Sequence, residues 1–168
     1  MCQAYRQQYG ADFISAMPTN LYGPGDNFDL ETGHVLAALI RKFHEAKASG
    51  GPVTLWGSGR PRREFLHVDD CAEACLYLMD RYSDTEHVNV GVGKDMTVAE
   101  LATLIADVIG YGGDVRWDAS KPDGVRRKLL DCTRINRLGW YPRVRLPEGV
   151  KSTYAWYVES PTRRGGAS

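Results

Sequence analysis

The residues best suited to chemistry begin with a histidine at the start of an expected helix. Apolar residues recur at helical spacing after His34, so a helix is predicted from that residue onward. His34, Arg41 and Lys42 fall outside the apolar stripe, so a histidine and two bases can project from one helix. An unperturbed imidazole has a pKa of about 6.5 and can give or take a proton near neutral pH. Position alone favours a simpler interpretation, a solvent-facing histidine at a helix start.

A basic segment follows a glycine turn further along the chain. Gly57-Ser58-Gly59 ends a strand expected at Val53–Trp56, and three arginines lie between Arg60 and Arg63. A guanidinium can bind a pyrophosphate through two parallel hydrogen bonds. A solvated basic loop fits the same residues equally well.

A polar turn and the end of a short strand supply the remaining candidates. Asp123 and Lys128 belong to a turn rich in charge, where an aspartate can accept hydrogen bonds from ribose hydroxyls and a lysine can neutralise phosphate. The pattern alone favours a plain surface turn there. Residues Pro18 to Leu21 follow an apolar run, and open α/β sheets receive ligands at the carboxyl ends of their strands.

The elements that must position these residues alternate between strand and helix, which predicts the α/β class. Capping signals, apolar periodicity and glycine or proline breaks set their boundaries. The expected helices are Met1–Tyr9, His34 onward, Asp69 onward, Thr97–Ile109, Thr133–Leu138 and Pro147–Glu159. The expected strands are Phe13–Met17, Val53–Trp56, Phe65–Val68, His87–Gly91 and Val115–Trp117, with loops at Thr19–Gly33 and Ser120–Arg127.

Composition excludes several classes of protein. The chain has 168 residues, 43% hydrophobic and 25% charged, with 21 basic against 21 acidic residues. That balance argues against a nucleic-acid binder and against disorder. No run approaches the roughly 20 apolar residues of a membrane span, and no signal peptide is evident, so we expect no membrane partner and a cytoplasmic location. The four cysteines form no C-x-x-C pair, the four histidines are too scattered for zinc, and we expect no metal.

Several catalytic motifs are absent from the sequence. No G-x-G-x-x-G fingerprint for a dinucleotide, no Walker loop and no G-x-S-x-G elbow occurs. None of the nine tyrosines has a lysine four residues later, the pair that short-chain reductases use. A helix at Met1–Tyr9 without a preceding N-cap leads us to expect that the chain is roughly the second half of an enzyme.

A set of ordered motifs resembles a known family. They are Met17–Pro24, Trp56–Gly59, Arg63–Asp70, Ser120–Gly124 with Arg127-Lys128, and Leu138–Trp140. Together they are similar to the C-terminal part of the GDP-L-fucose synthases, which are extended short-chain dehydrogenases/reductases. Asp26-Asn27-Phe28, His34 and the Ser120–Lys128 block are the more specific matches, and the resemblance runs from about Met1 to Glu159.

The resemblance implies an architecture and an activity. The chain would hold the last strands of a Rossmann-type sheet, residues 1–30, and a small GDP-sugar-binding α/β subdomain with some return to the sheet, residues 31–160. Residues 161–168 would be a disordered tail. The family epimerises C3 and C5 of GDP-4-keto-6-deoxy-D-mannose and reduces C4 with NADPH to give GDP-L-fucose. Its serine-tyrosine-lysine set and catalytic cysteine belong to a part upstream of this sequence, and the full-length enzyme is a homodimer.

The resemblance also assigns residues to the sites. His34 matches the family's acid/base histidine and adjoins the cofactor. Trp56 could otherwise be a core residue, and Lys42 stands where arginine is the commoner residue. The implied substrate-binding residues are Lys42, Trp56, Arg63, Asp123 and Lys128, and those along the NADP site are Pro18, Thr19, Asn20 and Leu21.

Two further interpretations stay open. The chain could belong to another sugar-nucleotide epimerase or dehydratase, or it could be a non-catalytic module that binds a nucleotide sugar. In every case we expect the 168 residues alone to lack reductase activity, because the dinucleotide fingerprint and the tyrosine-lysine pair are absent from them.

Overall fold

The computed structural model describes residues 1–160, and the tail expected at 161–168 lies outside the described residues. Helices and strands alternate along the chain, so the predicted α/β class is confirmed. The helices are α1 (Cys2–Tyr9), α2 (Val35–Ser49), α3 (Val68–Arg81), α4 (Val98–Ile109), α5 (Thr133–Arg137) and α6 (Leu146–Glu159). The strands are β1 (Ala16–Pro18), β2 (Asn20–Tyr22), β3 (Val53–Trp56), β4 (Arg62–Arg63), β5 (Phe65–His67), β6 (Val88–Val90), β7 (Met96–Thr97), β8 (Val115–Asp118) and β9 (Arg127–Lys128).

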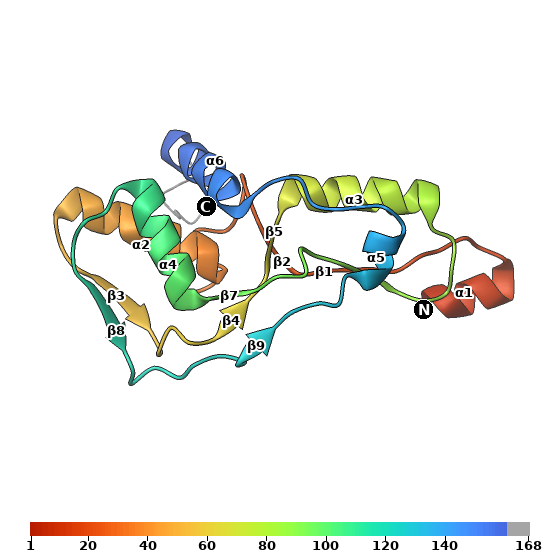
Figure 1. Cartoon of the computed structure of the whole chain (residues 1–168), viewed down its shortest axis with the longest axis horizontal. Helices are drawn as coiled ribbons and strands as arrows, with labels where there is room; N and C mark the ends of the chain where they lie inside the picture. The colour runs from red at the N-terminus through yellow and green to blue at the C-terminus, as the bar shows by residue number, and fades with distance from the viewer. Residues whose placement is uncertain (161–168) are drawn as a thin grey trace.

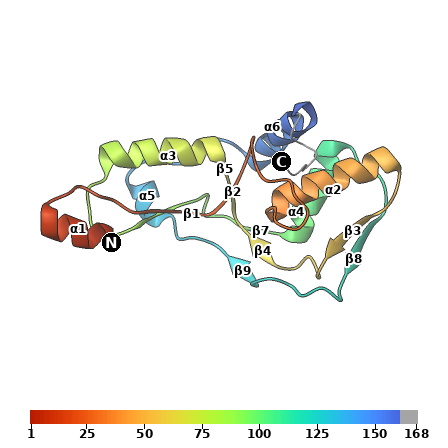
Figure 2. The same cartoon turned by 180° about the vertical axis from the view of Figure 1, so that it is seen from behind.

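The molecule is elongated, with one group of elements at each end (Figures 1 and 2). At one end α2, α4 and α6 gather above the paired strands β3 and β8, and we call this group the three-helix region. At the other end lie α1, α3 and α5 with the paired strands β1 and β6, and we call this group the α3 region. The short strands β4, β7 and β9 form a small sheet that lies between them.

The three-helix region has a core built from helix stripes that the sequence predicts. The stripe of α2 is buried, with Phe43 and Ile40 both at 0% exposure. The helix α4 begins at a complete capping box between Thr97 and Glu100 and ends at Gly110, which adopts a left-handed conformation. These caps fix the ends of α4, so its apolar face packs against α2 and α6.

The α3 region has a separate, smaller core. Its strands β1 and β6 are parallel, in a register that pairs Ala16 with Val88 and Pro18 with Val90. The strand was predicted at Phe13–Met17 and closed by proline, but Pro18 belongs to it. Proline has no N–H to donate, and the next residue, Thr19, donates its N–H to the carbonyl of Val90 at 3.0 Å instead.

Some local predictions were wrong. The strand β2 lies inside the segment predicted as a loop, and it pairs in parallel with β5. The two-residue strands β4, β7 and β9 were also missed. The apolar surroundings of Cys71 and Cys75 in the sequence favour two buried free thiols, but only Cys71 is buried. Cys75, one turn later on α3, is exposed because it lies outside the helix stripe that faces the core. Within residues 1–160 no helix is long and apolar enough to cross a membrane.

Candidate functional site

The small sheet separates four basic residues onto two faces. The strands β4 and β9 are parallel, in a register that pairs Arg63 with Lys128 and Arg62 with Arg127. Because successive side chains of a strand point to opposite faces, Arg63 and Lys128 share one face and the other two arginines share the opposite one. On that opposite face Arg62 and Arg127 both pair with Asp95, whose pKa they hold below its ordinary value through hydrogen bonds.

A cavity of about 170 Å³ lies on the Arg63 side of the strand. Three of the predicted substrate residues, Trp56, Arg63 and Asp123, line it together. They come from β3, from β4 and from the turn that follows β8, so the fold brings together residues far apart in the sequence. Other residues of the wall are Val35, Gly59, Pro61, Val98, Pro122 and Gly124.

Trp56 is a surface aromatic rather than a core residue. Its side chain is 59% exposed at the end of β3. The ammonium nitrogens of Lys42 and Lys121 lie 5.1 Å and 5.6 Å from the centre of its ring. Lys42 also donates a hydrogen bond to the carbonyl of Thr54 at 3.1 Å, and burial lowers the pKa of its amine. An accessible indole between two cations can stack on a nucleotide base while the cations neutralise phosphate.

Arg63 is held in place by the turn that it faces. Its Nη1 donates to the carbonyl of Arg62 at 2.8 Å and to the carbonyl of Val125 at 2.6 Å. A Cβ on Gly124 would lie 3.1 Å from its Nη2, so the glycine lets the turn approach the guanidinium closely. The remaining donors of the fork are not used within residues 1–160 and can bind an anion.

Asp123 ties the same turn to the glycine loop after β3. Its carboxylate accepts hydrogen bonds from the N–H of Ser58 at 2.7 Å and from the hydroxyl of Ser58 at 2.6 Å. These two bonds hold the pKa of Asp123 below its ordinary value. A Cβ on Gly57, whose φ is +78°, would lie 2.4 Å from the carboxylate, so glycine is required there. Lys128, in contrast, is exposed on β9 and contributes nothing to the cavity wall.

His34 stands at the edge of this site. It is the N-cap of α2, and the next residue, Val35, lines the cavity. Its side chain is 79% exposed, and its Nδ1 lies 3.8 Å from Oδ1 of Asp26. An accessible imidazole beside a carboxylate is suited to proton transfer.

Of the four residues predicted along the cofactor, Pro18 is exposed and the other three are half-buried. The amide of Asn20 donates to the carbonyl of Glu64 at 2.7 Å, and Leu21 packs against the core of the α3 region. Thr19 is half-buried, whereas Pro18 is exposed at the end of β1.

Sequence reasoning missed a buried carboxylate that holds the site together. Glu64 has 0% exposure, and its Oε1 accepts from the N–H groups of Val92 and Gly93, each at 2.6 Å. Its Oε2 accepts from the N–H of Leu130 at 3.0 Å. Glu64 therefore joins β5 to the segment after β6 and to the segment after β9. The only sequence signal is one acid between Arg63 and an apolar strand.

Comparison with known proteins gives a family and several relatives named GDP-L-fucose synthase. Residues 1–91 match the NAD dependent epimerase/dehydratase family. A protein of Arabidopsis thaliana named GDP-L-fucose synthase 1 is 56% identical over 97% of this chain and 51% of its own length. The GDP-L-fucose synthase of Escherichia coli is 51% identical over 99% of this chain and 55% of its own length. The chain spans about half the length of the curated relatives it matches.

Solved structures agree with the sequence matches. A GDP-L-fucose synthetase from Naegleria fowleri superposes with a TM-score of 0.86 at 32% identity, over 93% of this chain and 49% of that one. A UDP-glucose 4-epimerase from Thermotoga maritima, solved with UDP-glucose, superposes with a TM-score of 0.82 at 28% identity, over 94% of this chain and 49% of that one. The expected Rossmann-type, extended short-chain dehydrogenase architecture is therefore confirmed.

Proposed function

Because this chain belongs to the NAD dependent epimerase/dehydratase family, we propose that it supplies the nucleotide-sugar site of a GDP-L-fucose synthase. That enzyme would convert GDP-4-keto-6-deoxy-D-mannose to GDP-L-fucose with NADPH. The observation that carries the proposal is that Trp56, Arg63 and Asp123 line one cavity together, with Val35, the neighbour of His34, in its wall. The relatives named GDP-L-fucose synthase, at 51–61% identity, support the choice of GDP.

Each group in the site has a task that suits its chemistry. Trp56 stacks on the guanine ring, and the unused donors of Arg63 bind the diphosphate. Lys42 and Lys128 add positive charge from two sides, and the free lone pairs of Asp123 accept hydrogen bonds from the ribose. Lys42 supplies charge but cannot make the two-pronged contact of an arginine.

His34 is the acid of the epimerisation. Removal of a proton beside the C4 ketone leaves an enolate, and inversion requires a proton delivered to the other face of that carbon. The exposed imidazole at the cavity edge can deliver it. Each of C3 and C5 is inverted in this way before the ketone is reduced.

Of a dinucleotide cofactor, the residues at the end of β1 would contact only the nicotinamide end. Exposed Pro18 and the backbone from Thr19 to Leu21 would lie along the nicotinamide, with His34 nearby. The glycine fingerprint that binds the diphosphate of such a cofactor is absent from these 168 residues. When bound, NADPH supplies the hydride that reduces C4.

The domain division and the assembly follow the same proposal. Residues 1–30 belong to the Rossmann-type domain and residues 31–160 mainly to the GDP-sugar subdomain. The pairing of β6 with β1 supports a return to the sheet. The full-length enzyme forms a homodimer, and sedimentation of the full-length protein tests this.

The catalytic proposal is tested by His34→Gln in the full-length protein. Formation of the sugar inverted at C3 and C5 should fall by about 100-fold to 10,000-fold. Binding of GDP-sugar should persist. An unchanged rate of inversion would remove His34 from the mechanism and favour a non-catalytic binding module.

The 168-residue chain itself provides a second test. We expect no NADPH oxidation when it is mixed with the keto-sugar, and measurable oxidation would contradict the assignment. A reading frame that continues upstream of Met1 with a Tyr-x-x-x-Lys motif would support it.

A further inference from the structure

A carboxylate with an unused oxygen lies beside His34. Asp26 accepts one hydrogen bond at Oδ1, from the N–H of Asn27 at 2.7 Å. Its Oδ2 is buried and has no hydrogen-bond partner within residues 1–160. A buried polar atom without a partner costs free energy, so such an atom needs a reason.

The loop that carries Asp26 is fixed by its own hydrogen bonds. The N–H of Asp26 donates to the carbonyl of Gly23 at 3.3 Å. Asn27 donates to the hydroxyl of Thr32 at 3.1 Å, and Asp29 accepts from the N–H of Thr32 at 2.8 Å. The side chain of Asp26 therefore stays close to the start of α2 instead of turning to solvent.

The ring nitrogen that approaches this carboxylate is identified by distance. Nδ1 of His34 lies 3.8 Å from Oδ1 of Asp26, about 1 Å beyond a hydrogen bond, so the contact is with the oxygen that also accepts from Asn27 and not with the unpartnered Oδ2. The imidazole is 79% exposed, so a rotation of its side chain can close that gap in the free chain. Nearby charges have other partners, since Arg41 pairs with Glu45 and Asp29 caps its own loop. Burial raises the pKa of Asp26, and the N–H of Asn27 and then the imidazole of His34 oppose that shift.

We propose that Asp26 is a positioning residue for His34, which accepts Nδ1–H and so holds the neutral imidazole in the Nδ1–H tautomer with Nε2 free. The hydrogen bond made by one ring nitrogen decides which tautomer is present. An isolated imidazole in water favours the opposite tautomer, with the proton on Nε2. The carboxylate would therefore reverse the ordinary preference.

The proton step balances with this arrangement. The imidazolium of His34 carries a proton on each nitrogen. The enolate electron pair forms a C–H bond with the proton on Nε2, and the N–H electron pair stays on Nε2. What remains is the neutral Nδ1–H tautomer, the form that Asp26 stabilises. Solvent then returns a proton to Nε2. The catalytic part of this inference rests on the proposed function, whereas the tautomer does not.

Nitrogen-15 NMR of the 168-residue chain tests the tautomer directly. Two-bond proton–nitrogen correlations, recorded where imidazoles are neutral, should show His34 protonated mainly on Nδ1. Asp26→Ala should return it mainly to Nε2–H. Asp29→Asn is the matched control, because it removes a charge from the same loop but keeps the accepting oxygen, and His34 should not change. Exposed His87 serves as a reference in the same spectra.

The outcomes separate the two proposals. A wild-type His34 that is mainly Nε2–H overturns the role of Asp26 even if no variant folds, and it leaves the nucleotide-sugar assignment untouched. In the full-length enzyme, Asp26→Ala should lower kcat for epimerisation by about 10-fold to 100-fold with KM little changed. A rise in KM at constant kcat, or no change in either, would also overturn it.

Discussion

The two ends of the molecule differ in how completely they bury their own apolar residues. In the three-helix region α2, α4 and α6 enclose a core, and its most exposed large aromatic, Trp56, lines the candidate site. In the α3 region, Leu76 and Met79 on α3 are 68% and 75% exposed. The helix α1 buries none of its residues.

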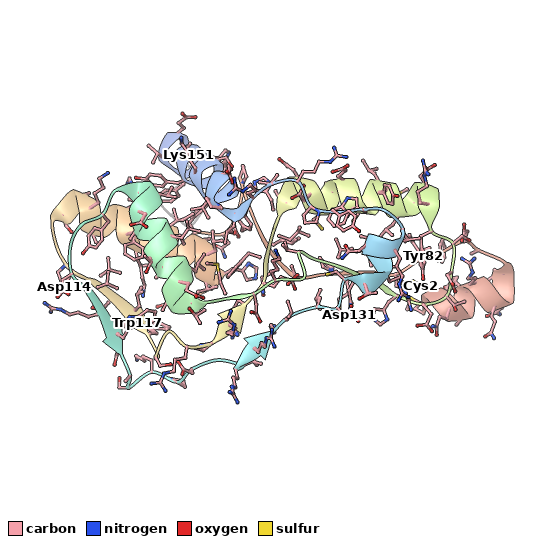
Figure 3. The ribbon with its side chains drawn as sticks, viewed as in Figure 1. Cys2, Tyr82, Asp114, Trp117, Asp131 and Lys151 are labelled. Carbon is pink, nitrogen blue, oxygen red and sulfur yellow. The ribbon has the colours of Figure 1, made fainter. Side chains whose placement is uncertain are left out.

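The difference in burial between the two regions shows which of them holds the candidate site residues rigidly. His34, Lys42 and Trp56 stand on elements of the region with the closed core. The α3 region contributes the predicted cofactor edge, and its exposed apolar side chains are the kind that mark contact surfaces. The two regions lie at opposite ends of the molecule. In Figure 3, Trp117 on β8 lies at the three-helix end, and Cys2 and Tyr82 lie at the α3 end. Three of the candidate residues therefore stand on the region with the closed core, whereas Arg63 stands on the small sheet between the regions.

The largest expected effect is a loss of stability caused by a substitution in the core of the three-helix region. Phe43→Ala empties a fully buried position of α2 and should lower the free energy of unfolding by about 3–5 kcal/mol. Leu76→Ala, the control on the exposed face of α3, should change it by less than about 0.5 kcal/mol. Denaturant unfolding of both variants measures this. Equal losses would mean that the two regions do not differ as described.

Thiol labelling reports on the α3 region alone, because all four cysteines lie in that region or at its edge. Burial raises the pKa of Cys71 and of Cys132 to about 11, against 9.0 for an ordinary thiol. Their thiolates are therefore about 100-fold scarcer near neutral pH, and both should react far more slowly than exposed Cys75. Mass spectrometry after brief alkylation gives the order. Early modification of Cys132 would show that the α3 region opens readily.

Glu64→Gln tests the link that this side chain makes between β5 and the segments after β6 and β9. The amide would place an NH₂ group against the N–H of Leu130, so one buried donor loses its acceptor. We expect a loss of about 1–3 kcal/mol in the free energy of unfolding. Thr103→Ala, on the exposed face of α4, is the surface control. An unchanged free energy would mean that Glu64 does not join the segments.

The smallest effect is a local acid transition at the site. The pKa of Asp123 is lowered in the folded chain, so its link to Ser58 is complete above the ordinary value of 3.8 and is lost as the pH falls through the folded value. The amide proton of Ser58 should therefore shift only below about pH 3.8. In Ser58→Ala the transition, followed at Asp123 itself, should move toward higher pH. A Ser58 signal that titrates well above that range would contradict the link.

Long periodic segments could be predicted from sequence, and very short strands could not. The helices α2 and α4 carry their own stripes and caps, so their sequence alone defines them. A two-residue strand such as β4 is defined by partners more than thirty residues away, which no local pattern reveals.

The candidate site was also predictable only in part, because some of its features depend on residues far away in the sequence. Side-chain type and resemblance pointed to Trp56 and Arg63, and the fold brings them together. Glu64 and Asp26 belong to the motifs that carry the resemblance, but no role could be assigned to them, because a role depends on which N–H or ring nitrogen faces each carboxylate. Lys128 could be placed on the Arg63 face only from the strand register.

Calorimetric binding of GDP to the 168-residue chain tests the central claim most directly. We predict that GDP binds more tightly than UDP or dTDP, and that Arg63→Lys weakens binding by about 10-fold, or 1.4 kcal/mol. Arg62→Lys, one residue earlier and on the opposite face of the same strand, should leave binding unchanged. Equal binding of the three nucleotides, or equal losses in both variants, would contradict a guanosine diphosphate site on the Arg63 face.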